Sequence, residues 1–375
     1  MLKQYKFRFY NFRLVFLLLS ISVIGVLLVG SAMESLKSRQ IMGVALGVAV
    51  MVIVSLMDFS WILNFYWLIY IFNIVMLLGV RLMGSTAGGA TRWIEIAGFR
   101  FQPTELSKIL LILFFARYFM DHENDLNTIK VIVKCVALLV VPLVLIYQQP
   151  DLKNTITVTV LFCVLIYIAG LSYKVIGGTI LIMVPLMIIF LSIVVQPDQK
   201  LIKDYQRDRI MSFLYPENEE YSDDIEQQNN SILAIGSGEL TGKGLNNEES
   251  SVNKGNFVSQ IQTDFIFAVA GEELGFIGCS LIILILLWIT FECIRMSLRS
   301  KDLSGKLICC GVATIVSLQS FINICVATGI MPNTGTPLPF VSYGLTSVVS
   351  LYIGMGLVLN VGLQSSSYKT RKISA

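Results

Sequence analysis

The chain has 375 residues, of which 55% are hydrophobic and only 14% are charged, against about 25% charged residues in ordinary soluble domains. A composition this apolar excludes a soluble globular protein, and the net charge of +3 is too small to indicate a nucleic-acid partner. The sequence therefore predicts an all-α, polytopic membrane protein, organised as a single transmembrane domain over 1–375.

About ten apolar runs are long enough to cross a hydrocarbon core of about 30 Å as helices. Basic residues precede the first run as in a signal peptide, but further apolar runs follow at once, so we expect a retained first helix. The predicted spans lie near 14–31, 41–57, 61–80, 104–120, 130–147, 155–171, 174–196, 264–294, 305–328 and 342–364.

The distribution of lysine and arginine indicates the orientation, because these residues gather in cytoplasmic loops. With a cytoplasmic N-terminus, the inside segments hold 15 of the 28 basic residues, and the outside segments hold 7 once the long loop 197–263 is set aside. We therefore expect both termini in the cytoplasm and a large extracellular loop, 197–263, between helices seven and eight. Nearly all unusual polar clusters then fall in outside connections, so the working face is predicted to point away from the cytoplasm.

The connection between the third and fourth helices holds two charged features. Arg92 next to Trp93 is either an anchor at the membrane interface or a guanidinium that holds an anionic group. Pro103 suits the first turn of a helix, and Glu105 is well placed near its positive N-terminus. Glu105 and Lys108 are three residues apart and can pair, either as a structural ion pair or as part of a substrate site.

The remaining connections supply further candidates. Asp151 either caps the next helix or binds a hydroxyl or a cation. In the long loop, residues 205–214 read as an amphipathic helix lying on the membrane, and the glycine-rich run 234–244 around Lys243 could wrap a phosphate. Three prolines in 329–344 predict a re-entrant or rigid loop that is buried in protein or lines a cavity.

Three carboxylates lie at the start of the eighth predicted span. An ionised Asp at a helix centre costs about 2.5–3.5 kcal/mol in insertion scales, so Asp264 is a functional candidate. Glu272 and Glu273 lie two to three turns deeper, and we expect them to serve structure or partner contact rather than chemistry. The seven cysteines fall in or beside apolar runs and predict neither a disulfide framework nor a metal site.

Together, these motifs resemble the SEDS family (shape, elongation, division and sporulation proteins, RodA- and FtsW-like), with the short termini most like RodA. The resemblance covers most of the chain in order. It rests on Arg92-Trp93-Ile94 with Gln102-Pro103-Thr104-Glu105 and Lys108, Gln149-Pro150-Asp151-Leu152, Ala234–Gly238 with Gly242-Lys243-Gly244, Thr263–Phe267 with Glu272–Gly275, and Pro337–Phe340 with Ser342-Tyr343-Gly344.

The resemblance implies a peptidoglycan glycosyltransferase of the bacterial cytoplasmic membrane. Such an enzyme polymerises lipid II at the outer membrane face and works with a class B penicillin-binding protein. The family's catalytic aspartate corresponds to Asp264, and its Glu and Lys on the fourth helix correspond to Glu105 and Lys108. Asp151 and Ser342 lie in its other motifs and are expected at the substrate site.

The reaction needs a base for the acceptor hydroxyl and positive charge for the leaving diphosphate. We expect Asp264 to be the base, and Arg92, Lys243 and Arg207 or Arg209 to hold the pyrophosphate. A divalent cation, Mg or Mn, is compatible with this chemistry.

The chain departs from the family pattern in Lys153-Asn154, where Gly-Thr is usual, which questions the backbone shape of that connection. Two other functions stay open. A lipid-precursor flippase or transporter would also have intramembrane charges and broken helices, although the sequence carries no inverted-repeat signal. A non-enzymatic scaffold for a penicillin-binding protein would not need Asp264.

Overall fold

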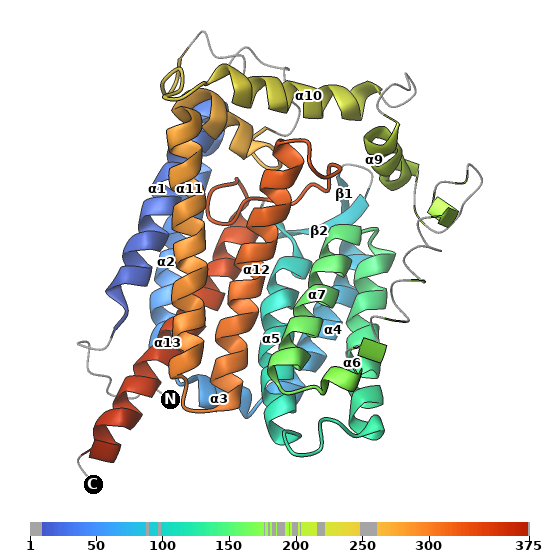
Figure 1. Cartoon of the computed structure of the whole chain (residues 1–375), viewed down its shortest axis with the longest axis vertical. Coiled ribbons are helices and arrows are strands. Elements are labelled where there is room, and N and C mark those ends of the chain that lie inside the picture. Colours follow the sequence, from blue (N-terminus) through green and yellow to red (C-terminus); the bar gives the residue numbers. More distant parts are fainter. Residues whose placement is uncertain are drawn as a thin grey trace.

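The chain folds into a bundle of long helices, with a small sheet and two of the shorter helices at one end (Figure 1). The computed structural model describes residues 10–87, 90–96, 99–175, 204–215, 222–247 and 261–373, with isolated positions between 177 and 202. The helices are α1 (Phe12–Ala32), α2 (Glu34–Leu56), α3 (Phe59–Leu63), α4 (Tyr66–Met83), α5 (Pro103–Asp121), α6 (Ile129–Gln148), α7 (Leu152–Ile168), α9 (Asp204–Leu214), α10 (Ser222–Ser237), α11 (Ile266–Arg299), α12 (Leu303–Ala327) and α13 (Leu345–Ile373).

The polytopic all-α fold predicted from the sequence is confirmed. In the described part of the chain, α1, α2, α4, α6, α11, α12 and residues 345–364 of α13 are long and apolar enough to cross a membrane. The predicted spans near 104–120 and 155–171 correspond to α5 and the shorter apolar α7. The predicted span at 174–196 falls largely outside the described residues. Helix α1 begins and α13 ends at the same end of the bundle (Figure 1).

Helix α13 runs through the interior of the bundle. It packs along α2 and also contacts α5, α11 and α12, and its Tyr352 is fully buried. The Tyr352 hydroxyl bonds the Ser22 hydroxyl of α1 at 2.7 Å. Peripheral helices show the opposite pattern, because Leu68 and Val75 of α4 and Val144 of α6 are exposed. Apolar side chains on these outer faces suit contact with lipid tails.

Helix α11 is broken near its N-terminus. Gly275 has φ 64° and ψ −165°, a conformation outside the helical region that suits glycine. The loop after α10 packs into this break, where Phe276 N donates to Glu239 O at 2.9 Å and Gly244 N donates to Glu273 O at 3.0 Å. A Cβ on Gly242 would overlap the backbone of Glu273. The glycine-rich run therefore serves close packing against α11, and its amides at 243 and 244 are bonded to α11 carbonyls rather than free to wrap a phosphate.

A small antiparallel sheet between α4 and α5 was not expected from the sequence. Its strands are β1 (Ser85–Ala87), β2 (Ala90–Ile96) and β3 (Phe99–Phe101), in the order β1-β2-β3. Figure 1 places this sheet at the same end as α9 and α10, opposite the end where α13 finishes.

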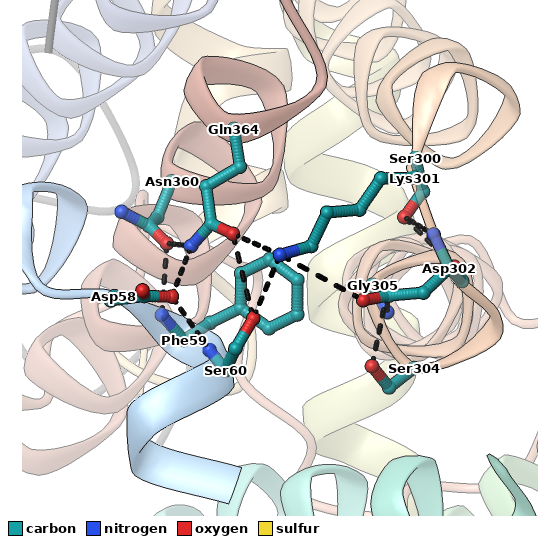
Figure 2. A network of polar contacts seen from close by, with 10 residues as sticks. All are labelled: Asp58, Phe59, Ser60, Ser300, Lys301, Asp302, Ser304, Gly305, Asn360 and Gln364. Carbon is teal, nitrogen blue, oxygen red and sulfur yellow. Dashed lines mark hydrogen bonds and ion pairs between the residues drawn. The ribbon is translucent and has the colours of Figure 1, made fainter. Parts of the chain in front are cut away.

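A polar network ties three parts of the chain together at the opposite end (Figure 2). We call Asp58, Ser60, Lys301, Asn360 and Gln364, with the capping residue Asp302, the far-end network. Gln364 Nε2 donates to Asp58 Oδ1 at 2.6 Å and to Asn360 Oδ1 at 2.9 Å. Lys301 Nζ donates to Gln364 Oε1 at 2.6 Å and to Ser60 Oγ at 2.9 Å.

Further contacts extend this network, among them the ion pair between Lys301 Nζ and Asp302 Oδ2 at 4.0 Å. Asp302 caps α12, because its Oδ1 accepts from Gly305 N at 2.8 Å and from Ser304 Oγ at 3.0 Å. Lys301 Nζ lies 5.1 Å from the centre of the Phe59 ring, a distance suited to a cation–π contact. The network thus joins the segment before α3, the turn between α11 and α12, and α13.

Candidate functional site

The four polar connections that the sequence placed on one face do meet at one end of the bundle. The Arg92 guanidinium of β2 donates to the carbonyls of Gln149, at 3.4 Å, and Pro150. Lys153 of α7 donates to the carbonyl of Gly335. Gln228 of α10 donates to the carbonyl of Met331 at 2.8 Å. Residues far apart in the sequence are therefore joined directly in this region.

The backbone around Asp264 is held by side chains from other segments. Asn323 Nδ2 of α12 donates to the carbonyl oxygens of Asp264 at 2.8 Å and Thr336 at 2.7 Å. Ser342 Oγ donates to Thr263 O at 2.6 Å and accepts from Leu338 N at 2.7 Å. Ser342 thus fixes the turn before α11 to the loop before α13, which gives the Asp264 side chain a defined place.

Three charged side chains surround Gly335 in that loop. A Cβ built on Gly335 would stand 3.2 Å from Asp264 Oδ2, 3.5 Å from Arg209 Nη1 and 3.7 Å from Lys153 Nζ. Gly335 has φ +69°, a backbone conformation that favours glycine. We call Asp264, Arg209, Lys153 and Gly335 the Gly335 cluster. It brings one carboxylate and two cations to a common point.

Helix α9 supplies the arginine of this cluster. The amphipathic helix expected over 205–214 is present as Asp204–Leu214. Arg209, one of the two arginines expected to hold pyrophosphate, lies at the Gly335 cluster. Arg207 on the same helix has a buried Nε without a hydrogen-bond partner among the described residues.

Asp151 is the centre of a second polar group. Its side chain is fully buried and caps α7 by accepting from Asn154 N at 3.4 Å. The other oxygen accepts from Asn154 Nδ2 at 2.8 Å, Gln102 Nε2 at 3.2 Å and Thr104 Oγ1 at 3.4 Å. Asn154, where the family pattern has threonine, is thus integrated into the structure. The capping role expected for Asp151 is confirmed, and these donors also tie α7 to the start of α5.

Glu105 and Lys108 form the predicted ion pair. Lys108 Nζ lies 2.9 Å from Glu105 Oε1, and the two side chains are 1% and 4% exposed, respectively. Pro103 occupies the first turn of α5, as expected. The second oxygen, Glu105 Oε2, accepts from Ser347 Oγ of α13 at 3.0 Å. The pair therefore links α5 to α13 inside the bundle.

Lys243, also expected to hold pyrophosphate, is paired with a carboxylate near the start of α11. Lys243 Nζ is 2.6 Å from Glu272 Oε1, whose side chain is fully buried. The neighbouring Glu273 accepts from the Ser31 hydroxyl of α1. Both glutamates thus hold the loop and α1 against the broken start of α11, in line with the structural role expected for them. The expected contact of Lys243 with pyrophosphate would require competition with Glu272.

The described part of the chain contains no cluster of side chains that would hold a metal ion without other ligands. No group of three or more His, Cys, Asp and Glu side chains gathers there. Magnesium is often held by one or two carboxylates together with substrate phosphates and water. Asp264 could supply one carboxylate to a site of this shared kind.

Several residues of this region were missed by sequence reasoning. Lys153 was noted only as a departure from the family pattern, although a charged residue at an expected glycine is itself a signal. Asn323 lies in an apolar span and was not considered, although a polar side chain inside a membrane helix is a reason to look. Arg92 bonds two backbone carbonyls, a role that neither of its two interpretations included.

The sequence and the fold were compared with known proteins. The profile of a family described as cell cycle protein, FtsW/RodA/SpoVE, matches residues 5–367. Peptidoglycan glycosyltransferase MrdB of Escherichia coli K12 is 30% identical over 93% of this chain and 92% of its own length. The probable peptidoglycan glycosyltransferase FtsW of Geobacter sulfurreducens is 33% identical over 74% of this chain and 72% of its own.

A solved structure gives a similar result. This structure concerns the structural coordination of polymerization and crosslinking by a peptidoglycan synthase complex. Its matching chain is 25% identical in sequence to the present chain. It superposes with a TM-score of 0.79 over 94% of this chain and 97% of its own length.

Proposed function

The chain belongs to the FtsW/RodA/SpoVE family, and we propose that it polymerises lipid II into glycan strands, with Asp264 as the general base. It is a multi-pass protein of the bacterial inner membrane and a glycosyltransferase. The proposal adds to this the substrate, the base and the membrane face.

The proposed reaction transfers a glycan from a lipid diphosphate to a sugar hydroxyl. The acceptor oxygen attacks the anomeric carbon, its proton passes to the Asp264 carboxylate, and the bond to the diphosphate breaks. The diphosphate leaves with the electron pair. A positioned base typically contributes 100- to 10,000-fold to such a step, and cations at the leaving group stabilise its developing charge.

The observation that carries the proposal is the Gly335 cluster. Asp264 Oδ2 lies near the guanidinium of Arg209 and the ammonium of Lys153. A base and a pair of cations are the two elements that the reaction requires, and here they surround one point. The backbone bonds from Asn323 and Ser342 support a fixed position for this base, which favours catalysis by orientation.

We propose that the reaction takes place at the outer face of the membrane, on the basis of the charge distribution and the fold. The basic residues favour cytoplasmic termini, and the Gly335 cluster lies in the connections at the end of the bundle opposite the end of α13. The lipid tail of the substrate would then stay in the bilayer beside the bundle, while its diphosphate reaches the cluster from the outer leaflet.

A divalent cation, Mg or Mn, is proposed only as a shared ligand of Asp264 and the substrate phosphates. The carboxylate provides one oxygen donor of the kind that Mg²⁺ prefers. With the cation bound, the negative charge of the diphosphate would be partly neutralised.

The proposed protein partner is a class B penicillin-binding protein. The support is that a structurally similar chain is part of a peptidoglycan synthase complex that coordinates polymerization and crosslinking. A partner of this kind would crosslink the strands that the present chain makes.

The test is polymerisation of lipid II by the purified chain, without a partner. We expect Asp264→Asn to lower the rate about 100- to 10,000-fold. Asp125→Asn is the matched control, because Asp125 is exposed in the turn between α5 and α6 and should keep the wild-type rate. Wild-type rates in Asp264→Asn would rule out the assigned base.

The same assay separates the two other functions. A flippase would move lipid II across a vesicle membrane and yield no glycan strand from the chain alone. A scaffold would support strand synthesis only when a penicillin-binding protein is added, and Asp264→Asn would not change that activity.

A further inference from the structure

Lys153 occupies an unusual place for a lysine. It is the second residue of α7, where the helix macrodipole disfavours a cation. Its ammonium bonds the carbonyl of Gly335 and lies on the side of that glycine where Asp264 and Arg209 also gather. Nothing in the family resemblance assigns a role to this position, where glycine is usual.

The contact with Gly335 does not use the full capacity of the ammonium. A lysine ammonium carries three donors, and in the described part of the chain one of them reaches the Gly335 carbonyl. A neutral donor would satisfy that carbonyl equally well, without placing a charge at a helix N-terminus. A cation at this point gains most if a negatively charged group lies beside it.

The charges of the cluster indicate what that group is. Lys153 and Arg209 together carry two positive charges, against one negative charge on Asp264. No ion pair within 4.0 Å joins these three side chains to one another among the described residues. Arginine suits two-point contact with phosphate oxygens, and lysine binds phosphate as a point charge. The cluster therefore has an excess positive charge that an anion with several oxygens can neutralise.

We propose that Lys153 is a diphosphate-binding residue of the lipid-linked donor, acting with Arg209 on the phosphate oxygens at the Gly335 cluster. This inference rests on the proposed function for the identity of the donor. The Gly335 carbonyl positions the ammonium, and the two remaining N–H groups bind the diphosphate. Lys153 thus supplies, from α7, a cation that belongs to this chain rather than to the family motif.

The test measures binding apart from turnover. The purified full-length chain in detergent is titrated with undecaprenyl diphosphate, and with undecaprenol, which has the same tail and no phosphate. Lys153→Met keeps the length of the side chain without its charge, and Lys153→Arg keeps the charge. Lys130→Met, at an exposed lysine in the first turn of α6, is the matched control. Melting curves establish that each variant is folded.

We expect Lys153→Met to weaken undecaprenyl diphosphate binding about tenfold or more, as for the loss of a charged hydrogen bond. Lys153→Arg should bind within about threefold of wild type, and Lys130→Met should match wild type. Undecaprenol binding should be the same in all four proteins. Raising the salt concentration should reduce the difference between wild type and Lys153→Met.

Two results would overturn the inference. One is equal binding of undecaprenyl diphosphate by folded Lys153→Met and wild type, which would leave Lys153 as a tether of the Gly335 loop. The other is wild-type protein that binds undecaprenyl diphosphate no better than undecaprenol, which would also remove the proposed donor. If Asp264→Asn polymerises lipid II normally while Lys153→Met loses binding, the assigned base is wrong and the diphosphate contact stands.

Discussion

The two ends of the bundle use a lysine in different ways. In the far-end network, Lys301 bonds two side chains, Gln364 and Ser60, and lies over an aromatic ring. In the Gly335 cluster, Lys153 bonds a backbone carbonyl and stands near a carboxylate and a guanidinium. The first arrangement holds the ammonium between neutral partners on α3 and α13, with the carboxylate of the neighbouring Asp302 at 4.0 Å. The second leaves charged groups close together around a glycine.

The difference separates the two kinds of polar region in this protein. Polar groups that join segments are matched with partners within the chain, because an unmatched buried group costs about 1–3 kcal/mol. A region that binds a charged substrate keeps part of its hydrogen-bonding capacity for that substrate. The far-end network joins segments of the chain. Under the proposed function, the Gly335 cluster binds a charged substrate.

The largest effect is expected at the buried pair of α5. Lys108→Met leaves Glu105 buried without its cation, which should lower the free energy of unfolding by about 3–5 kcal/mol. The double variant Lys108→Met with Glu105→Gln should recover most of that loss, because no charge then remains buried. Thermal or denaturant unfolding in detergent measures both. A stable Lys108→Met protein with a raised KM for lipid II would instead place Lys108 in the substrate site.

The next effect is expected at Gly335. A Cβ there would stand 3.2 Å from Asp264 Oδ2, so Gly335→Ala should displace the carboxylate and lower polymerisation about 100-fold. Gly329→Ala is the control, because Gly329 also has a positive φ, +77°, but its Cβ would meet the flexible Ile232 side chain. Both variants should lose about 1–2 kcal/mol of stability.

Lipid II polymerisation rates and melting curves separate these two losses. Equal rates in Gly335→Ala and Gly329→Ala would mean that the space beside Asp264 does not matter for the reaction.

The smallest effect is expected in the far-end network. Asp302→Ala removes the cap of α12 and should lower the free energy of unfolding by about 1 kcal/mol, with no change in the rate of polymerisation. Asp302→Asn keeps a capping oxygen, so its free energy of unfolding should lie within a few tenths of a kcal/mol of the wild-type value. A clear loss of polymerisation in a folded Asp302→Ala protein would instead mean that the two ends of the bundle are coupled.

The sequence predicted much of the helical fold because each long apolar run has only one stable form in a membrane, the hydrogen-bonded helix. It also predicted the Glu105–Lys108 pair and the cap at Asp151, since both depend on spacing within one helix. The sheet was missed because its strands are short and separated by glycines, and only Ile94-Glu95-Ile96 alternate in polarity as a strand does.

The site was predicted only in part because its geometry depends on contacts between distant segments. Asp264 and Arg209 were selected by residue type and motif, and they do lie together. Lys243 has a suitable charge, but its partner is Glu272, a contact that a sequence pattern does not specify. Lys153 and Gly335 lie 182 positions apart, so only the folded chain brings them together.

The attachment of the loop after α10 to the broken start of α11 has a consequence for chain entropy. The chain is held to α11 at Gly244, whose amide bonds Glu273, and it enters the same helix at Ile266. These two points are about seven residues apart along the helix, or roughly 10 Å. Both points belong to one helix, so that helix sets the distance between them. The entropy cost of closing a loop in general rises by only about 0.6 kcal/mol when its length doubles. Asp264, two residues before Ile266, is held separately, because Asn323 bonds its carbonyl and Ser342 bonds the carbonyl of Thr263.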